Sequence, residues 1–85
     1  MLAKGIKPPQ QFKQLKATWK NTGKNPDTKN AEIWYDEGMF WGKLGHGDPP
    51  LKANTYKGHR WNARVDGTII MNWTIEDDDE YFFEI

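Results

Sequence analysis

The sequence predicts an all-β protein, a small antiparallel β-sandwich of about six to eight short strands. Three observations support this fold class. Apolar and polar residues alternate in short runs, breaker residues separate these runs at intervals of about 8 to 12 residues, and no segment is a credible helix. A chain of 85 residues has room for one domain. We place it at residues 12–85, behind a flexible, proline-containing lead-in at residues 1–11.

The first strand is expected to start near Phe12 and to run to Trp19. A loop of about ten residues follows, because Asn, Gly and Pro are frequent at residues 20–30. Residues 31–44 predict two aromatic strands around an Asp-Glu-Gly turn, which is typical of a β-hairpin.

The second half of the chain continues the same pattern. Gly58 permits a bend, and an Asp-Gly pair within residues 65–75 predicts a second hairpin. Three other segments are expected to be extended, at residues 51–56, 59–65 and 81–85. In the first of these, Leu51, Ala53 and Thr55 share one face.

The charges cancel over the whole chain but not along it. Twelve basic and twelve acidic residues argue against a general polyanion binder. Residues 1–30 carry seven lysines against Asp27, and residues 66–85 carry seven acids and no base. Opposite charges attract, so the terminal strands are expected to lie near each other. The acidic run at residues 76–80 is interpreted as a solvated loop, since its spacing matches no calcium-binding loop.

Several classes of function are disfavoured by composition. The chain has no cysteine, no apolar run of membrane-spanning length and no signal-peptide pattern, so we expect a cytoplasmic protein. Catalysis is not expected, because the chain lacks serine and its paired carboxylates lie in the acidic run. His46 and His59 with Asp48 suggest no metal site, because a third ligand is missing, and no cofactor is expected. His46 is expected to be exposed in its Gly-flanked loop.

The strongest functional pattern lies between residues 41 and 61. Side chains alternate along a strand, so Thr55, His59 and Trp61 line one face if the bend preserves the alternation. Trp41 could close that face from a neighbouring strand, and Trp34 could form another wall. Such an aromatic box with two polar groups suits a small apolar ring that carries a hydroxyl.

Each of these residues also has a purely structural interpretation. Trp61 alone favours a core position, and His59 alone is more often a satisfied structural histidine. Only the joint spacing favours a ligand pocket. The remaining large aromatic residues that we assign mostly to the core are Trp19, Trp73, Phe82 and Phe83.

The segment NTYKGHRW, residues 54–61, resembles the SYRGHLW segment of the von Hippel-Lindau tumour suppressor β-domain family. FWGKLGHG is similar to that family's Tyr-Pro-Thr-Leu-Pro-Pro-Gly stretch, which places Trp41 at a pocket tyrosine and Gly47 at a loop glycine. WKNTG is similar to its Phe-Cys-Asn-Arg-Ser segment and matches Asn21 to its asparagine, and VDGTIIMNWTI resembles its next hairpin. The resemblance extends over residues 12–85 and implies a stand-alone β-domain of this kind.

The resemblance implies recognition of an extended peptide that carries 4-hydroxyproline. Thr55 and His59 stand at the family's serine and histidine, which hydrogen-bond the prolyl hydroxyl, and Trp61 stands at the tryptophan beneath the ring. Tyr56 matches a tyrosine that flanks the peptide groove, and Asn54 matches a histidine that contacts the peptide backbone.

The sequence also departs from the family. Trp41 in place of tyrosine removes a phenolic hydroxyl and adds bulk, so peptide selectivity is expected to differ. Trp34 is our candidate for the second wall of the pocket. The chain ends at Ile85 without the helical domain through which the tumour suppressor recruits elongin and a cullin ligase, so this recruitment is not expected.

Two other binding functions remain open. The aromatic residues could stack on single-stranded nucleic acid, with phosphate contacts from Lys43, Lys52, Lys57, Arg60 and Arg64. Alternatively, a sheet edge could pair with a partner chain and no small pocket would be needed.

Overall fold

The computed structural model describes residues 14–76 and 80–85. The expected lead-in, Phe12 and the middle of the acidic run lie outside the described residues. Seven strands and one 3-10 helix occur in the described part: β1 (Leu15–Lys20), η2 (Pro26–Thr28), β2 (Glu32–Tyr35), β3 (Met39–Lys43), β4 (Leu51–Thr55), β5 (Arg60–Val65), β6 (Thr68–Thr74) and β7 (Tyr81–Glu84). The all-β prediction is confirmed, and no helix in this part of the chain has the length and apolar character of a membrane span.

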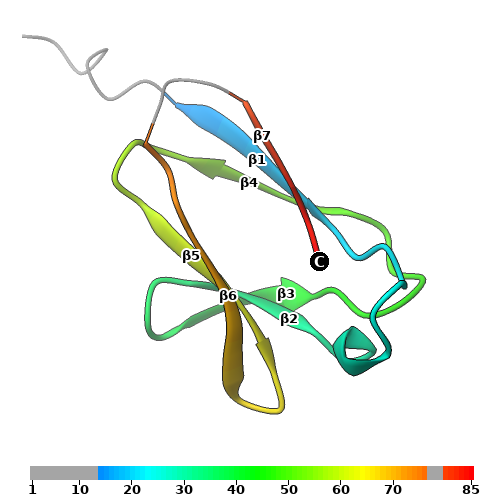
Figure 1. Cartoon of the computed structure of the whole chain (residues 1–85). Coiled ribbons are helices and arrows are strands. Elements are labelled where there is room, and N and C mark those ends of the chain that lie inside the picture. Colours follow the sequence, from blue (N-terminus) through cyan, green and yellow to red (C-terminus); the bar gives the residue numbers. More distant parts are fainter. Residues whose placement is uncertain (1–13, 77–79) are drawn as a thin grey trace, which may run out of the picture.

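The strands form two facing sheets, a β-sandwich, with the orders β4-β1-β7 and β3-β2-β5-β6 (Figure 1). Among these strands all pairs are antiparallel apart from β1 with β7, which is parallel. β1 belongs to the basic start of the chain and β7 to its acidic end. The expectation that the oppositely charged ends lie near each other is therefore confirmed.

The core lies between the sheets and is built around two tryptophans. Trp19 on β1 is fully buried and Trp61 on β5 is 2% exposed, with ring centroids 4.8 Å apart. A tryptophan buries about 150–250 Å² of surface, which at about 25 cal/mol per Å² contributes roughly 4–6 kcal/mol each. The other buried apolar residues of this cluster come from both sheets and their ends: Leu15, Ala17, Ile33, Leu44, Ala53, Ala63 and Ile75.

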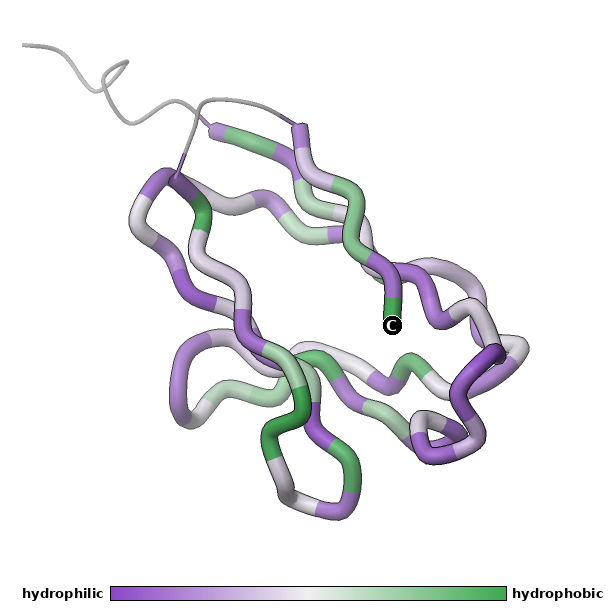
Figure 2. The backbone as a smooth tube through the Cα atoms, in the orientation of Figure 1, coloured by the Kyte–Doolittle hydropathy of each residue, from purple (hydrophilic) through white to green (hydrophobic). Residues whose placement is uncertain are grey.

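The assignment of aromatic residues to the core is confirmed for three of the four. Trp19 is central, and Trp73 and Phe83 pack against it at centroid distances of 6.3 Å and 5.7 Å. Phe82 is 71% exposed, so its assignment was wrong. Successive residues of a strand face opposite sides of the sheet, and Phe83 already faces inward. Figure 2 shows a further hydrophobic region at the β5–β6 hairpin, where Ile69, Ile70 and Met71 are exposed.

The predicted turns have the backbone that their residues favour. Asp66 and Gly67 both have positive φ, at 51° and 80°, as a two-residue type I′ hairpin turn requires. Gly58 has φ 94° between β4 and β5, which confirms the expected bend. The chain therefore passes from the sheet of β4 to the sheet of β5 directly after Thr55. On β5 the side chain of Trp61 faces the core.

The loop between β1 and β2 is more ordered than expected, because Asn21 and Asn25 organise it. The Asn25 side chain accepts from the Asp27 N–H and caps η2, and Pro26 occupies its first turn. Asn21 is buried, and its Nδ2 donates to the carbonyl oxygens of Thr28 and Leu44 at 2.9 Å and 2.8 Å. Asn21 thus joins the end of β1 to two other loops.

Candidate functional site

Trp41 owes its position to a β-bulge. The β2–β3 register shifts between Ile33 and Trp34, which leaves Trp41 as the extra residue on β3. A bulge re-aims a side chain relative to regular alternation. The Trp41 indole Nε1–H donates to the carbonyl oxygen of Lys52 on β4 at 3.2 Å. Trp41 therefore bridges the edge strands of the two sheets while 42% of it stays exposed.

Five rings gather at this side of the sandwich, and we call them the aromatic cluster: Tyr35, Trp41, Tyr56, His59 and Trp61. Trp61 lies 4.9 Å from Tyr35 and 5.3 Å, edge-on, from Trp41. The His59 ring lies 5.1 Å from Tyr35 and 5.4 Å from Tyr56. The structure thus brings Trp41, His59 and Trp61 into one continuous group.

Thr55 and Trp61 are buried in the core and are not exposed to a ligand, which differs from the expectation. Thr55 is fully buried and Trp61 is 2% exposed. The Trp61 Nε1–H donates to Thr55 Oγ1 at 2.9 Å, inside the core. A buried indole N–H requires an acceptor, and the Thr55 hydroxyl provides it. The structural interpretation of Trp61 as a core residue is therefore what the structure shows.

His59 is half-buried and is oriented by Thr55, whose Oγ1 lies 3.3 Å from His59 Nδ1. The Thr55 oxygen already accepts from Trp61, so its own proton needs an acceptor. Among the described residues His59 Nδ1 is the group beside this hydroxyl that can accept, in the tautomer that leaves Nδ1 unprotonated. With Thr55 as the donor, a neutral His59 carries its proton on Nε2, and no residue of the described part lies within hydrogen-bonding distance of Nε2.

Trp34 does not join the aromatic cluster, and its placement as a pocket wall is corrected. It lies on the other face of its sheet, edge-on to Phe40 at 5.6 Å and beneath the Arg64 guanidinium at 4.2 Å. Its neighbour Tyr35 takes the expected place, opposite Trp61 in the β2–β5 register. The sequence signal for Tyr35 was its shared alternation with buried Ile33.

The two residues expected at the peptide groove lie on different sides of β4. Asn54 is exposed on the outer face of its sheet, opposite Lys16. Tyr56 is half-buried beyond the end of β4, and its hydroxyl accepts from Gln14 Nε2 at 3.4 Å. Tyr56 therefore packs with His59, whereas Asn54 lies on β4, the edge strand that Trp41 contacts.

A depression of about 530 Å³ lies over the outer face of the β4-β1-β7 sheet. Trp41 and Asn54 contribute to its β4 side and Phe82 to its β7 side. The remaining lining residues are Lys16, Thr18, Lys52, Ala53 and Glu80. This depression combines exposed aromatic rings with two lysines, Lys16 and Lys52, that form no ion pair with an acid of the described residues.

The cations considered for nucleic-acid binding are dispersed. Lys52 lines the depression beside Trp41, and Lys43 lines another one beside His46. Arg60 and Arg64 line a third depression on the opposite sheet. Arg60 is paired with Asp36 at 3.0 Å, and Arg64 donates to the Glu37 carbonyl oxygen at 2.7 Å while covering Trp34. In the described part of the chain no three acidic or histidine side chains are arranged to hold a metal ion.

Comparisons with family models, with curated proteins and with solved structures find no match to this chain. The geometry of the aromatic cluster and of the β4 edge is therefore the basis for a functional proposal.

Proposed function

We propose that the protein is a non-catalytic module that binds an extended peptide containing 4-hydroxyproline. In this proposal the peptide backbone pairs with the free edge of β4, the pyrrolidine ring packs beside Trp41, and His59 donates to the prolyl hydroxyl. The observation that carries the proposal is the His59 ring, whose Nδ1 is engaged by Thr55 while its Nε2 is left to an external acceptor.

The edge of β4 supports backbone pairing. β4 pairs with β1 on one side and is the end strand of its sheet. The Lys52 carbonyl oxygen accepts from Trp41 and so points away from β1. In an antiparallel pair this orientation recurs at every second residue, so the N–H and C=O of Asn54 point the same way. An added strand can pair there, as in β-augmentation.

Trp41 supplies the apolar surface for the ring. Its indole is held at one end by Lys52 and rests edge-on against Trp61, yet 42% of it is exposed. A ligand ring therefore finds an oriented aromatic platform whose conformational freedom is already restricted.

The expected selectivity differs from that of a pocket with two hydroxyl-binding groups. Thr55 is buried and internally bonded, so it acts by positioning His59 and makes no contact with the ligand. Plain proline would leave one donor, His59 Nε2, without water and without a partner. One such group costs about 1–3 kcal/mol, which predicts a preference for hydroxyproline of roughly fivefold to 150-fold.

Titration of matched proline and hydroxyproline peptides tests this function. The wild-type protein should prefer the hydroxylated peptide, and His59→Ala should bind both peptides equally. His46→Ala is the matched control, because it removes the other histidine of the chain and should keep the preference. Equal binding of the two peptides by the wild-type protein, or binding of neither, would show that the proposal is wrong.

Single-stranded nucleic acid has less support as a ligand. The cations nearest the exposed rings are Lys16 and Lys52, and both arginines of the opposite sheet are engaged within the fold. Binding that weakens steeply with added salt would favour nucleic acid, whereas capture of a neutral ring should respond little.

A further inference from the structure

The charged side chains beside the β4 edge bear on which residues a bound peptide carries next to its ring. Two lysines, Lys52 on β4 and Lys16 on β1, line the depression on the outer face of this sheet. Neither is within ion-pair distance of an acid of the described part. The acids of the same sheet lie on β7, where Glu80 lines the far side of the depression and Glu84 lies opposite Lys20.

Charge is thus graded across the sheet. In the order β4-β1-β7, positive side chains occupy the outer face of the first two strands and negative ones that of the third. Neighbouring strands lie about 4.8 Å apart, so β7 is roughly 10 Å from β4 and farther still from a strand added beyond it. A peptide at the β4 edge would therefore meet Lys52 first, Lys16 next and Glu80 last.

Alternation along an added strand assigns its side chains to two faces. Residues whose side chains turn toward the aromatic cluster alternate with residues whose side chains turn outward, over Lys52 and Lys16. If the hydroxyproline ring packs on the side of Trp41 that faces Trp61, the residues directly before and after it face outward. The side chain of Asn54, which is exposed on this outer face, offers them a hydrogen-bonding neighbour without adding charge.

We infer that the peptide carries aspartate or glutamate directly beside the hydroxyproline, and that Lys52, with Lys16 behind it, binds these carboxylates. This inference rests on the proposed function, because it takes the position of the ring from it. Exposed lysine–carboxylate pairs are modest, about 1.4- to 5-fold in affinity each. Two acidic neighbours should therefore tighten binding by roughly 2- to 25-fold, and added salt should reduce this gain.

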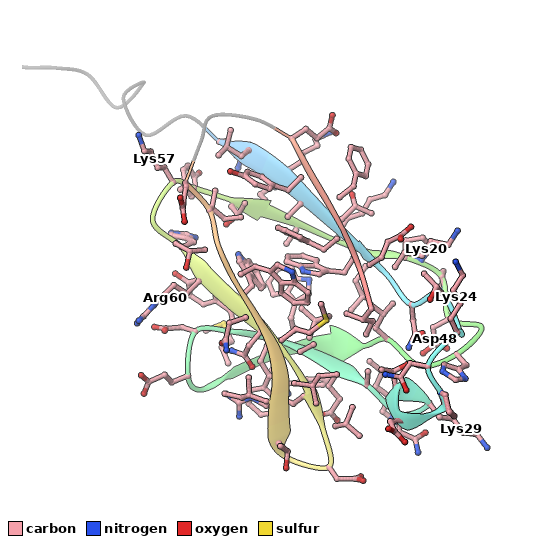
Figure 3. All side chains as sticks on the ribbon, viewed as in Figure 1. Lys20, Lys24, Lys29, Asp48, Lys57 and Arg60 are labelled. Carbon is pink, nitrogen blue, oxygen red and sulfur yellow. The ribbon has the colours of Figure 1, made fainter. Side chains whose placement is uncertain are left out.

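Four peptides of equal length test the inference, combining proline or hydroxyproline with aspartate or asparagine at both flanking positions. They are titrated by calorimetry into the full chain, into Lys52→Ala and into Lys24→Ala. Lys24 is the matched control, because it is exposed on the loop after β1, at the other end of the sandwich from Lys57 (Figure 3), and does not line the depression. We expect aspartate to tighten binding to the wild-type protein and to Lys24→Ala, and the gain to shrink in Lys52→Ala.

The outcomes separate the two proposals. A preference for hydroxyproline with equal affinity for aspartate and asparagine overturns the inference and leaves the proposed function standing. An aspartate preference that Lys52→Ala reduces, with no difference between proline and hydroxyproline, supports the lysine site and overturns the hydroxyl-binding role of His59. Binding of no peptide overturns both. Displacement of the acidic peptide by a short single-stranded oligonucleotide at lower concentration overturns the inference in favour of nucleic acid.

Discussion

His46 and His59 lie in the two loops that flank β4, and the fold uses their rings differently. His46 Nε2 lies 2.9 Å from the Asn25 carbonyl oxygen and 3.1 Å from Thr28 Oγ1, so the proton on this nitrogen is donated within the protein. His59 Nδ1 faces the Thr55 hydroxyl at 3.3 Å, and no described residue lies within hydrogen-bonding distance of His59 Nε2. Both rings are half-buried, and burial alone would not distinguish them.

The surroundings of the two rings explain the difference. The His46 loop is tied to its neighbours by backbone contacts, among them those from the His46 N–H to the Lys29 carbonyl oxygen and from Gly45 N–H to Asp48 Oδ2. Around His59 the neighbours are the rings of Tyr35 and Tyr56, which pack against the imidazole. One end of β4 is held by internal hydrogen bonds of the His46 ring, and at the other end the His59 ring has one nitrogen, Nε2, without a partner among the described residues. The expectation that His46 is simply exposed was wrong, because its ring joins two loops.

Asn21→Ala should loosen the loops around His46, and its loss of stability is the largest effect we predict. The change removes the donor to the buried carbonyl oxygens of Thr28 and Leu44, and each unsatisfied group costs about 1–3 kcal/mol. Urea unfolding should show a loss of stability of roughly 2–6 kcal/mol. The hydroxyproline preference of the molecules that remain folded should not change, since the His59 end shares none of these contacts. A loss below about 0.5 kcal/mol would show that Asn21 does not hold this end together.

The sequence was informative where the backbone depends on local residue type. The Asp-Gly turn at residues 66–67 and the bend at Gly58 could be predicted, because their φ values depend on local residue type. The opposite charges at the two ends of the chain predicted that the terminal strands lie near each other, and in the structure β1 pairs with β7. The helix η2 was missed although its cap is local, with Asn25 accepting from the Asp27 N–H, because a helix of three residues is too short to show a periodic pattern.

The site was less predictable than the fold, for two physical reasons. A shift of one residue reverses the face on which a side chain lies, so Tyr35 and not Trp34 lies beside Trp61. The β-bulge likewise changes the direction of the Trp41 side chain relative to regular alternation. A sequence also does not show which of several donors a given hydroxyl oxygen accepts from. Thr55 was expected to hydrogen-bond a ligand, but its hydroxyl oxygen accepts from the buried Trp61 Nε1–H within the core.

Thr55→Val sharpens the comparison, because Thr55 connects the core to His59. Valine keeps the shape but leaves the Trp61 Nε1–H buried without an acceptor, at a cost of about 1–3 kcal/mol in the free energy of unfolding. It also frees the His59 ring, so the hydroxyproline preference should fall. Thr55→Ser keeps the hydroxyl and should retain that preference even where stability decreases. If Thr55→Val bound the hydroxylated peptide as selectively as the wild-type protein, Thr55 would not position His59.

The smallest predicted effect comes from comparing His46→Ala with His59→Ala in the absence of ligand. His46→Ala removes two short internal contacts, each contributing about 0.5–1.5 kcal/mol, so the free energy of unfolding should fall by roughly 1–3 kcal/mol. His59→Ala removes one contact of 3.3 Å at a position that water reaches, so the loss should stay below about 1 kcal/mol. Thermal and urea unfolding of the two variants show which substitution lowers the free energy of unfolding more. A larger loss for His59→Ala would make His59 the structural histidine, and its Nε2 would no longer support a binding role.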